Sequence, residues 1–434
     1  MERRALRTAS SRRTRAPARA AGAAALALAF GVMADESAPP AAPIPSASPA
    51  RWFDPATAPF IPIPEVDIAP HSGLTLGVIA TVLYNNERGD LNQIFAPDVI
   101  HSQYFGWGSR MRAYEYPSDD TQWSVVGGLK QRVEREFDAR YVTGLVRDTR
   151  YSWSIETIYD RSGTPRFFGL GNDSLKANES TYVDNQERID ASLGRNFTRE
   201  LQLAYLIRLR NVSVLPGVIA GVPSIETRFP DQTGIGTMHE VDQRLILTYD
   251  TRDSPMVPRG GSRYLLYGGF ASRRFGSSFA DSSFGVDLRH YSPLDADSTL
   301  ALHAALRHMP SARGAPFWAM SSLGGDRSVL GERDPMRAYG EDRFIDHNLL
   351  SAGVELRTRA MIFDAFATHV SLEFAPFADV GKVYSDTDGA PFSRLHHGFG
   401  LGIRGVASPF VVGYVDFGYG HEKLSVFSGL DYPF

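Results

Sequence analysis

The sequence contains no cysteine among its 434 residues. This absence excludes a disulfide-stabilised scaffold and any metal site built on thiolates. Beyond residue 34 the chain also has no run of 18 apolar residues, so it predicts no membrane-spanning helix. The fold must therefore come from short elements that neither disulfides nor long apolar helices hold together.

Recognisable catalytic motifs are missing as well. The sequence has no GxSxG, no HExxH and no phosphate-binding P-loop, and we expect no enzyme activity, cofactor or metal site. The pair His396 and His397 offers metal ligands, although a solvated pair is the simpler interpretation. A Ser-His pair on an outer barrel face remains an open alternative. The formal net charge of −4 argues against a nucleic-acid partner.

The first 34 residues differ in composition from the rest of the chain. Seven arginines and one glutamate lie in the first 19 positions, an apolar run follows over residues 20–30, and residues 32–34 read Val-Met-Ala. A basic region, a short apolar region and a small-residue cleavage site are typical of a secretory signal peptide. We therefore predict a signal peptide over residues 1–34.

Two further regions follow the leader. Residues 35–70 are rich in proline and alanine, as in ESAPPAAPIPSASPA, and this composition favours a flexible periplasmic segment. Residues 71–434 show no break in composition. We assign residues 71–434 to one β-barrel, because a barrel uses as one domain a length that a soluble chain would divide.

Apolar and polar residues alternate throughout this region. Alternate positions from Leu201 to Leu209 are apolar, whereas Arg208 and Arg210 lie on the opposite face. Period two with one apolar face is the signature of a β-strand. A soluble sandwich would explain any single segment of this kind. The many charged residues on the polar face, and the continuation of the pattern to the last residue, favour a barrel with a wet lumen.

The alternating segments number about 16, an even number as in bacterial outer-membrane barrels. We place them near residues 73–84, 103–116, 123–134, 139–148, 150–161, 183–196, 201–213, 241–251, 262–273, 282–292, 298–309, 349–359, 370–384, 397–407, 410–420 and 423–434. With a periplasmic amino terminus, the long connections 162–182, 214–240 and 310–348 all fall outside the cell. The connection 360–369 is expected to be a small turn with a helical piece. The predicted fold class is an all-β, transmembrane antiparallel β-barrel.

Four motifs carry a family resemblance. Residues 167–173 read FFGLGND, residues 250–261 read DTRDSPMVPRGG, residues 336–339 read MRAY, and residues 377–384 read FADVGKVY. In order and spacing they resemble the barrel of the outer-membrane assembly superfamily that includes BamA and TamA, also called the bacterial surface antigen family. The resemblance covers residues 70–434 and implies a protein of the bacterial outer membrane.

The resemblance has two departures. Ala338 stands where the loop motif of the family has a glycine, so the backbone there must adopt a conformation that alanine tolerates. The periplasmic POTRA domains of larger members, which bind client chains and partner lipoproteins, have no counterpart in residues 35–70. The sequence thus resembles a barrel-only member of the family, and its client remains unknown.

The polar loop at residues 323–348 carries four arginines and six acidic residues. In the family that the sequence resembles, the loop arginine pairs with carboxylates on the inner barrel wall, which implies a loop folded into the lumen. Arg337 would be that arginine. By alternation, Glu355 and Asp379 face inward, so we expect both to contact Arg337, with Tyr339 packed beside it. The alternative is a solvated surface arginine.

The other motif residues receive structural roles. The expected periplasmic turn is formed by Asp250, Arg252, Asp253, Pro258 and Gly260. The expected tight loop with positive φ is formed by Phe168, Gly169, Gly171 and Asn172. At the carboxyl end, Tyr432 and Phe434 lie on one face of the last strand, and in similar proteins the insertion machinery recognises a terminal aromatic residue. The seam between first and last strands is where such barrels are thought to open.

The sequence thus predicts an outer-membrane barrel that inserts or translocates proteins, with a client that uses the seam. Two alternatives remain: a passive porin-like channel, and a surface antigen or adhesin whose long loops bind outside the cell. The expected partners are outer-membrane lipid, lipopolysaccharide and the assembly machinery during the protein's own insertion. No nucleic acid is expected among them.

Overall fold

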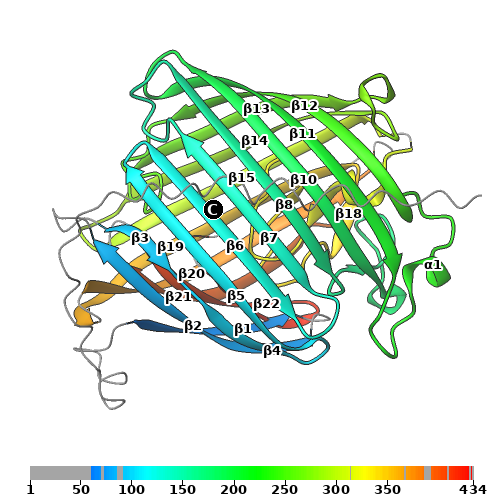
Figure 1. Ribbon diagram of the computed structural model, residues 1–434, viewed down its shortest axis with the longest axis horizontal. Coiled ribbons are helices and arrows are strands. Elements are labelled where there is room, and N and C mark those ends of the chain that lie inside the picture. The colour runs from blue at the N-terminus through cyan, green and yellow to red at the C-terminus, as the bar shows by residue number, and fades with distance from the viewer. Residues whose placement is uncertain are drawn as a thin grey trace, which may run out of the picture. The chain divides into compact units, whose positions relative to one another are not determined.

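The chain forms a closed antiparallel β-barrel of 18 strands in the computed structural model (Figure 1). The structure describes residues 60–69, 73–85, 91–312, 314–365, 368–385, 392–407, 410–429 and 432. The expected signal peptide, residues 1–34, lies outside this part of the chain. The described residues contain no helix long and apolar enough to cross a membrane.

Nineteen strand segments build the wall, and two of them share one position in the barrel. The segments are β1 (Ile61–Ala69), β2 (Gly73–Asn85), β3 (Leu91–Phe95), β4 (Asp98–Ser102), β5 (Gly106–Ser118), β6 (Thr121–Lys130), β7 (Arg135–Thr143), β8 (Tyr151–Ser162), β10 (Ser180–Asn196), β11 (Leu201–Pro216), β12 (Gly236–Asp250), β13 (Gly261–Ala271), β14 (Asp281–Pro293), β15 (Ser298–Ser311), β19 (Asn348–Ala365), β20 (Thr368–Tyr384), β21 (His396–Ala407), β22 (Phe410–Gly420) and β23 (Lys423–Gly429). β3 and β4 share a position because both pair with β2 on one side and β5 on the other. β1 pairs with β23 and closes the ring.

Short elements lie in the connections. They are β9 (Arg166–Phe167), α1 (Ile225–Arg228), β16 (Ser321–Leu323), β17 (Arg333–Asp334), β18 (Phe344–Asp346), and the 3-10 turns at Lys176–Asn178, Arg273–Phe275 and Phe317–Ala319. β9 adds to β10, and β16, β17 and β18 form a separate small sheet. β9, α1 and the 3-10 turns lie toward one end of the barrel, here called the loop end, whereas the small sheet lies in the lumen. The opposite end, with mostly short connections, is called the turn end (Figure 1).

The predicted fold class is confirmed, but the prediction of about 16 strands missed two of them. β1 lies in the segment expected to be flexible, yet residues 61–69 pair along their whole length with β2. β3 and β4 lie in what was expected to be a loop. Proline explains both misses, since Pro62 and Pro64 lie in β1 and Pro97 interrupts the third strand, and proline removes a ladder donor.

The missed strands flank β2, so every later strand keeps its predicted direction. The three longest connections therefore share the loop end, as expected. The connection near 360–369 differs from the expectation of a helical piece, because β19 continues to Ala365 and β20 begins at Thr368. β19 extends past the predicted strand end at Arg359 because residues 361–365 pair with β20 after an irregularity in register between Arg359 and Met361.

The side chains of the wall strands alternate between the membrane face and the lumen face. Leu245 and Leu247 on β12 point outward and are exposed to the membrane, whereas Asp242 and Arg244 on the same strand are buried on the lumen side. This is the apolar-out, polar-in alternation of a membrane barrel. The lumen face is consequently rich in charge, and its buried charges must be paired.

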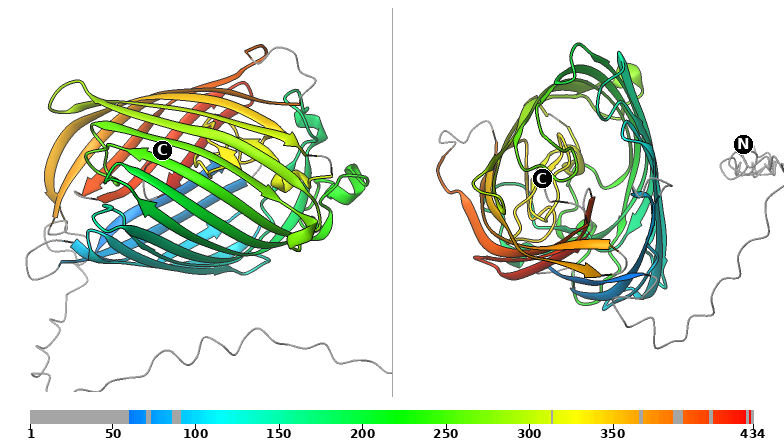
Figure 2. Two further views of the ribbon diagram at one scale, coloured as in Figure 1. Left: turned by 90° about the horizontal axis from the view of Figure 1, so that it is seen from above. Right: turned by 90° about the vertical axis from the view of Figure 1, so that its left-hand side faces the viewer.

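The lumen is not empty. Figure 2, viewed along the barrel, shows the segment between β15 and β19 inside the ring of strands, drawn in yellow. Apolar residues cover the loop end over β10 to β15, where Phe167, Tyr182, Ile225, Phe279 and Phe317 pack in one cluster. The barrel therefore holds the long loop between a charged wall and an apolar cover.

The expected last strand, residues 423–434, is described as β23 over Lys423–Gly429, and beyond it Tyr432 is the one residue that the structure describes. The Tyr432 hydroxyl donates to Glu373 at 2.9 Å, and the Arg357 guanidinium lies 3.9 Å from the Tyr432 ring centroid. Arg357 is buried on the lumen side, so the Tyr432 ring also lies on the lumen side, where stacking on a guanidinium stabilises it. Phe434 lies outside the described residues, and the insertion-signal role of both aromatics stays a prediction.

Candidate functional site: the inward loop

The candidate site is the loop between β15 and β19, residues 312–347. The small sheet of β16, β17 and β18 gives the loop a fixed core, with Leu323 opposite Phe344 in one antiparallel pair. Leu323, Met336 and Phe344 are buried against Leu349 and Val383 of the wall. The loop is thus a packed element of the lumen that presents selected polar side chains to the wall.

Arg337 binds the barrel wall through several hydrogen bonds and ion pairs. Its guanidinium donates to Asp379 through Nε at 2.9 Å and Nη2 at 2.8 Å, and to Glu355 through Nη1 at 2.6 Å. The same Nη1 lies 3.4 Å from an oxygen of Asp416, and the guanidinium carbon lies 3.6 Å from the Phe377 ring centroid. The Arg337 side chain is fully buried. The structure therefore brings together Arg337, Glu355 and Asp379, the three charged residues that the sequence placed at this site.

Charge explains why Arg337 can be buried. Burial alone lowers the pKa of the Arg337 guanidinium, but the carboxylates of Asp379, Glu355 and Asp416 outweigh it and raise the pKa well above its ordinary value. Three wall strands contribute one carboxylate each: β19, β20 and β22. A planar guanidinium with five donors is suited to such a convergent set, which a lysine could not match.

Two wall arginines belong to the same network, although sequence reasoning did not single them out. Arg404 on β21 donates to both oxygens of Glu355, at 2.5 and 2.8 Å, and Arg357 donates to Glu355 at 2.7 Å. Asp416 lies 3.4 Å from Arg404. Alternation would have placed Arg404 and Asp416 on the lumen face. Whether these two residues meet Arg337 depends on their height along the barrel axis, and no sequence pattern gives that height.

Ala338 fits the loop without a glycine. It is not among the described residues with positive φ, so its backbone does not require glycine. Its methyl group is fully buried against the wall, where the missing side chain of Gly398 leaves room: a Cβ on Gly398 would lie 2.3 Å from the Ala338 Cβ. Tyr339 packs beside it, with its ring 5.3 Å from that of Phe344 and its hydroxyl donating to the His397 carbonyl at 3.5 Å.

The FFGLGND segment packs on the loop and on the loop end of β20 and β21. Asn172 accepts from the Val383 nitrogen at 3.2 Å and donates to the Arg394 carbonyl at 2.8 Å. Gly169 and Gly171 have φ of 95° and 103°, the positive values expected from the motif. Phe168 is buried under the guanidinium of Arg343, whose carbon lies 4.2 Å from the ring centroid. These contacts make the segment a cover for the inward loop.

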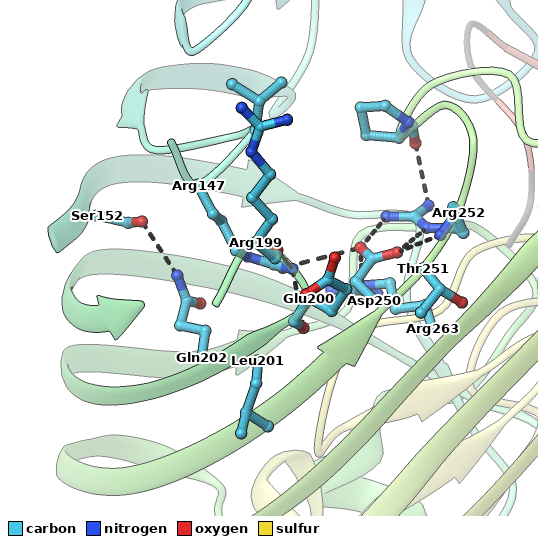
Figure 3. Close-up of polar contacts among 12 residues, drawn as sticks. Arg147, Ser152, Arg199, Glu200, Leu201, Gln202, Asp250, Thr251, Arg252 and Arg263 are labelled. Carbon is cyan, nitrogen blue, oxygen red and sulfur yellow. Dashed lines mark hydrogen bonds and ion pairs between the residues drawn. The ribbon is translucent and has the colours of Figure 1, made fainter. Parts of the chain in front are cut away.

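The predicted turn motif lies at the turn end, far along the chain from the loop. Asp250 accepts from Arg252 at 2.9 and 2.8 Å, and Arg147 and Arg263 lie 3.8 and 3.9 Å from the same carboxylate (Figure 3). Asp253 accepts from the nitrogens of Arg259 and Gly260, at 3.0 and 3.1 Å. Pro258 is buried in this turn. The motif residues therefore hold adjacent turns together and do not contact Arg337.

One group among the described residues has the composition of a metal site. Ligand atoms of Asp287, His303 and Asp334 all lie within 4.8 Å of one another. Asp287 already accepts from Arg289 at 2.8 and 3.1 Å, and His303 lies 3.3 Å from Asp287. The charges are compensated within the protein, so we assign no metal to this group.

Comparisons with known proteins agree on the fold. A family model described as the Omp85 superfamily domain matches residues 121–423. BamA from Haemophilus ducreyi lacking POTRA domains 1-3 is similar in structure, with 12% sequence identity, a TM-score of 0.50, and coverage of 81% of this chain and 75% of that chain. No curated protein matches the sequence.

CdiB structures are more distant matches. CdiB from Escherichia coli has 13% identity and a TM-score of 0.46, with 84% of this chain and 61% of that chain covered. CdiB from Acinetobacter baumannii has 12% identity and a TM-score of 0.43, with 85% and 58% covered. This chain thus spans less than two thirds of either CdiB. The family model covers well over half of the sequence, and on that basis this chain is a bacterial outer-membrane β-barrel that belongs to the Omp85 superfamily.

Proposed function

We propose that this protein inserts or translocates other proteins at the outer membrane, and that the client enters through the seam between β1 and β23. The observation that carries the proposal is the pairing at this seam. Among the described residues, Ile68 and Val426 are the one pair of Cα partners that joins β1 to β23. β22 and β23, by contrast, pair continuously from Tyr414 with Gly429 to Gly420 with Lys423.

The sequence of β1 explains the weak seam. The Val66 nitrogen points to β23 but donates to the Ser428 hydroxyl at 2.8 Å, rather than to a main-chain carbonyl. In a strand, every second residue directs its backbone groups to the same edge. Pro62 and Pro64 share that edge with Val66 and have no N–H to donate. β1 therefore presents few ladder donors to β23, and separating the two strands costs few hydrogen bonds.

The anchored loop supports this route over an open channel. Arg337 holds the loop across the lumen through carboxylates of three strands. A passive porin requires an open water path, which a packed and buried loop obstructs. A client strand at an opened seam would meet the edges of β1 and β23, and adding a strand to such an edge supplies main-chain hydrogen bonds. The proposal assigns no catalytic group.

The test joins β1 to β23 with a disulfide, so that the seam cannot open. Because the sequence has no cysteine, the pair Ile68→Cys and Val426→Cys supplies the sole thiols, on directly opposed residues of neighbouring strands. The protein in liposomes is given a urea-unfolded outer-membrane barrel as client, and folded client is measured by its resistance to heat in gels. We expect the oxidised pair to abolish insertion and a reductant to restore it.

The matched control is a disulfide within the continuous ladder. Tyr419→Cys and Leu424→Cys are opposed on β22 and β23, so oxidation there leaves the seam free. Insertion that persists with the seam locked, or that is lost equally with the control pair, would overturn the seam route.

A further inference from the structure

The inward loop touches the lumen wall at a second place, on the side of β11 and β12. The contact is made by the tip of the loop, defined here as Ser328–Glu332. The Glu332 carboxylate forms ion pairs with Arg208 and, at 3.6 Å, with Arg210 on β11. The Arg244 guanidinium on β12 donates to the Leu330 carbonyl at 2.7 Å. The loop therefore contacts the lumen wall at two places, the Arg337 partners on β19, β20 and β22, and the strands β11 and β12, which β13, β14 and β15 separate from β19.

An apolar contact accompanies these polar ones. The Leu330 side chain packs on a wall cluster of Ile246, Leu265 and Tyr267. Gly331 follows with φ of +72°, and a Cβ there would lie 2.6 Å from an Arg244 nitrogen. The tip is a tight turn, since the Glu332 nitrogen donates to the Val329 carbonyl at 2.9 Å. The tip is therefore one compact turn whose backbone lies close to Arg244 on the wall.

The two wall contacts of the loop differ in whether a buried charge would lose its partner when the contact breaks. Without Arg337, the buried Asp379 would have no other ion-pair partner among the described residues. Without Glu332, Arg208 keeps its two hydrogen bonds to Asp190, at 2.9 and 2.8 Å. A buried charge left alone is far more costly than a pair separated into water.

The second wall arginine behaves in the same way. Arg210 keeps its hydrogen bond to Glu240 at 2.7 Å when Glu332 leaves. The Glu332 side chain is already 17% exposed, whereas Arg337 and Glu355 are at 0%. Arg333, the residue after the tip, is fastened to Glu341 at 3.0 Å within the loop itself. Movement can therefore be confined to the tip.

We infer that the loop is a brace between two parts of the lumen wall with unequal ends: the tip releases from the wall of β11 and β12, while Arg337 remains bound as the pivot. Release widens the lumen on the β11 side and leaves the loop core in place. This inference goes beyond the seam proposal and does not depend on it, because a brace of this kind would also serve a barrel with another function.

The test compares thiol accessibility at the tip and at the pivot. Single cysteines are introduced into the cysteine-free chain as Val329→Cys, in the tip, and Met336→Cys, next to Arg337. Each is combined with Glu332→Gln, and the rate of modification by a water-soluble maleimide is measured on the refolded barrel in liposomes. We expect Glu332→Gln to raise the rate at position 329 by about fivefold, the factor for losing a partly exposed ion pair. The rate at position 336 should not change.

Glu341→Gln is the matched control. It makes the same substitution in the same loop, but Glu341 pairs with Arg333 and not with the wall. Folding of every variant is checked by heat-modifiability in gels. Equal acceleration at positions 329 and 336 would show that the loop leaves as a whole, and an unchanged rate at 329 would show that Glu332 does not hold the tip; either result overturns the inference. Client insertion is not measured here, so failure of the seam proposal would leave this result unaffected.

Discussion

Asp379 accepts three hydrogen bonds from Arg337. Two come from the guanidinium, at 2.9 and 2.8 Å, and the third comes from the main-chain nitrogen at 3.1 Å. One wall carboxylate thereby fixes both the side chain and the backbone of the loop residue. Asp379 has no other ion-pair partner in the described part of the chain, so its burial depends on Arg337. Arg337 in turn has two further carboxylates, those of Glu355 and Asp416.

The first prediction concerns the energy of this pair. Arg337→Ala should lower the free energy of unfolding by about 3–5 kcal/mol, because it leaves the buried Asp379 carboxylate without an ion-pair partner. Asp379→Ala should cost less, because Arg337 keeps Glu355 and Asp416. The double variant should cost less than the sum of the two, since it removes both charges. Urea unfolding of the barrel in lipid bilayers measures the three values.

Arg359→Ala is the comparison for this prediction. Arg359 pairs with Asp297 at the turn end, with side chains 30% and 54% exposed. A pair open to solvent contributes about 0–1 kcal/mol. If Arg337→Ala were no more destabilising than Arg359→Ala, the buried network would not anchor the loop.

The second prediction concerns ion flow through the lumen. In planar bilayers the wild-type protein should give small, flickering currents, and Arg337→Ala should give larger ones, because the loop loses its hold on β19, β20 and β22. Arg337→Lys should resemble the alanine variant more than the wild type, since an ammonium cannot bind Asp379 bidentately while reaching Glu355. Large and steady currents from both wild type and Arg337→Ala would mean that the loop does not close the lumen.

The fold was predictable wherever alternation was uninterrupted. β11, for example, shows period two from Leu201 to Arg210, and its direction and face follow from the sequence. β1 could not be read in this way, because Pro62 and Pro64 give it the composition of a flexible segment. Its strand conformation comes from pairing with β2, a tertiary contact that composition does not reveal. The contacts of Tyr432 were not predictable for a similar reason, since the buried Arg357 on which its ring stacks lies 75 positions earlier in the chain.

The site was predictable in part. Alternation identified Glu355 and Asp379 as inward-facing, and the motif resemblance supplied Arg337. Alternation assigns a face but not a height along the barrel, which depends on strand tilt and stagger. For that reason Arg404 and Asp416, which also face inward, were not connected with Arg337. The contact of Glu332 with Arg208 joins residues 124 positions apart and has no local signal at all.

The third prediction tests how the loop accommodates Ala338. Gly398→Ala should destabilise the barrel by about 1–3 kcal/mol, the usual cost of overpacking, because its new methyl group would lie 2.3 Å from that of Ala338. Ala338→Gly in the same chain should recover most of the loss by removing the second methyl group. Urea unfolding of the two single variants and the double variant gives the coupling energy. Strictly additive effects would mean that the two positions do not meet.

The fourth prediction separates two adjacent glycines of the turn motif at the turn end. Gly261 has φ of +95°, and a Cβ there would lie 2.2 Å from the Thr251 carbonyl oxygen. Gly260 does not have positive φ, and its nearest neighbour for a Cβ is Asp253 at 3.7 Å. Gly261→Ala should therefore cost about 3 kcal/mol or more, through backbone strain and a clash with backbone, whereas Gly260→Ala should cost less than about 1 kcal/mol.

Gly268→Ala completes this comparison, because it lies on the same strand as Gly261 and has open space. The nearest atom to its Cβ would be the Phe284 Cβ at 3.9 Å, an ordinary van der Waals distance. Urea midpoints for the three variants should rank Gly261→Ala lowest, with the other two close to wild type. The motif glycine singled out from the sequence was Gly260, so a larger loss at Gly260 than at Gly261 would mean that the turn adopts a different backbone conformation from the one described.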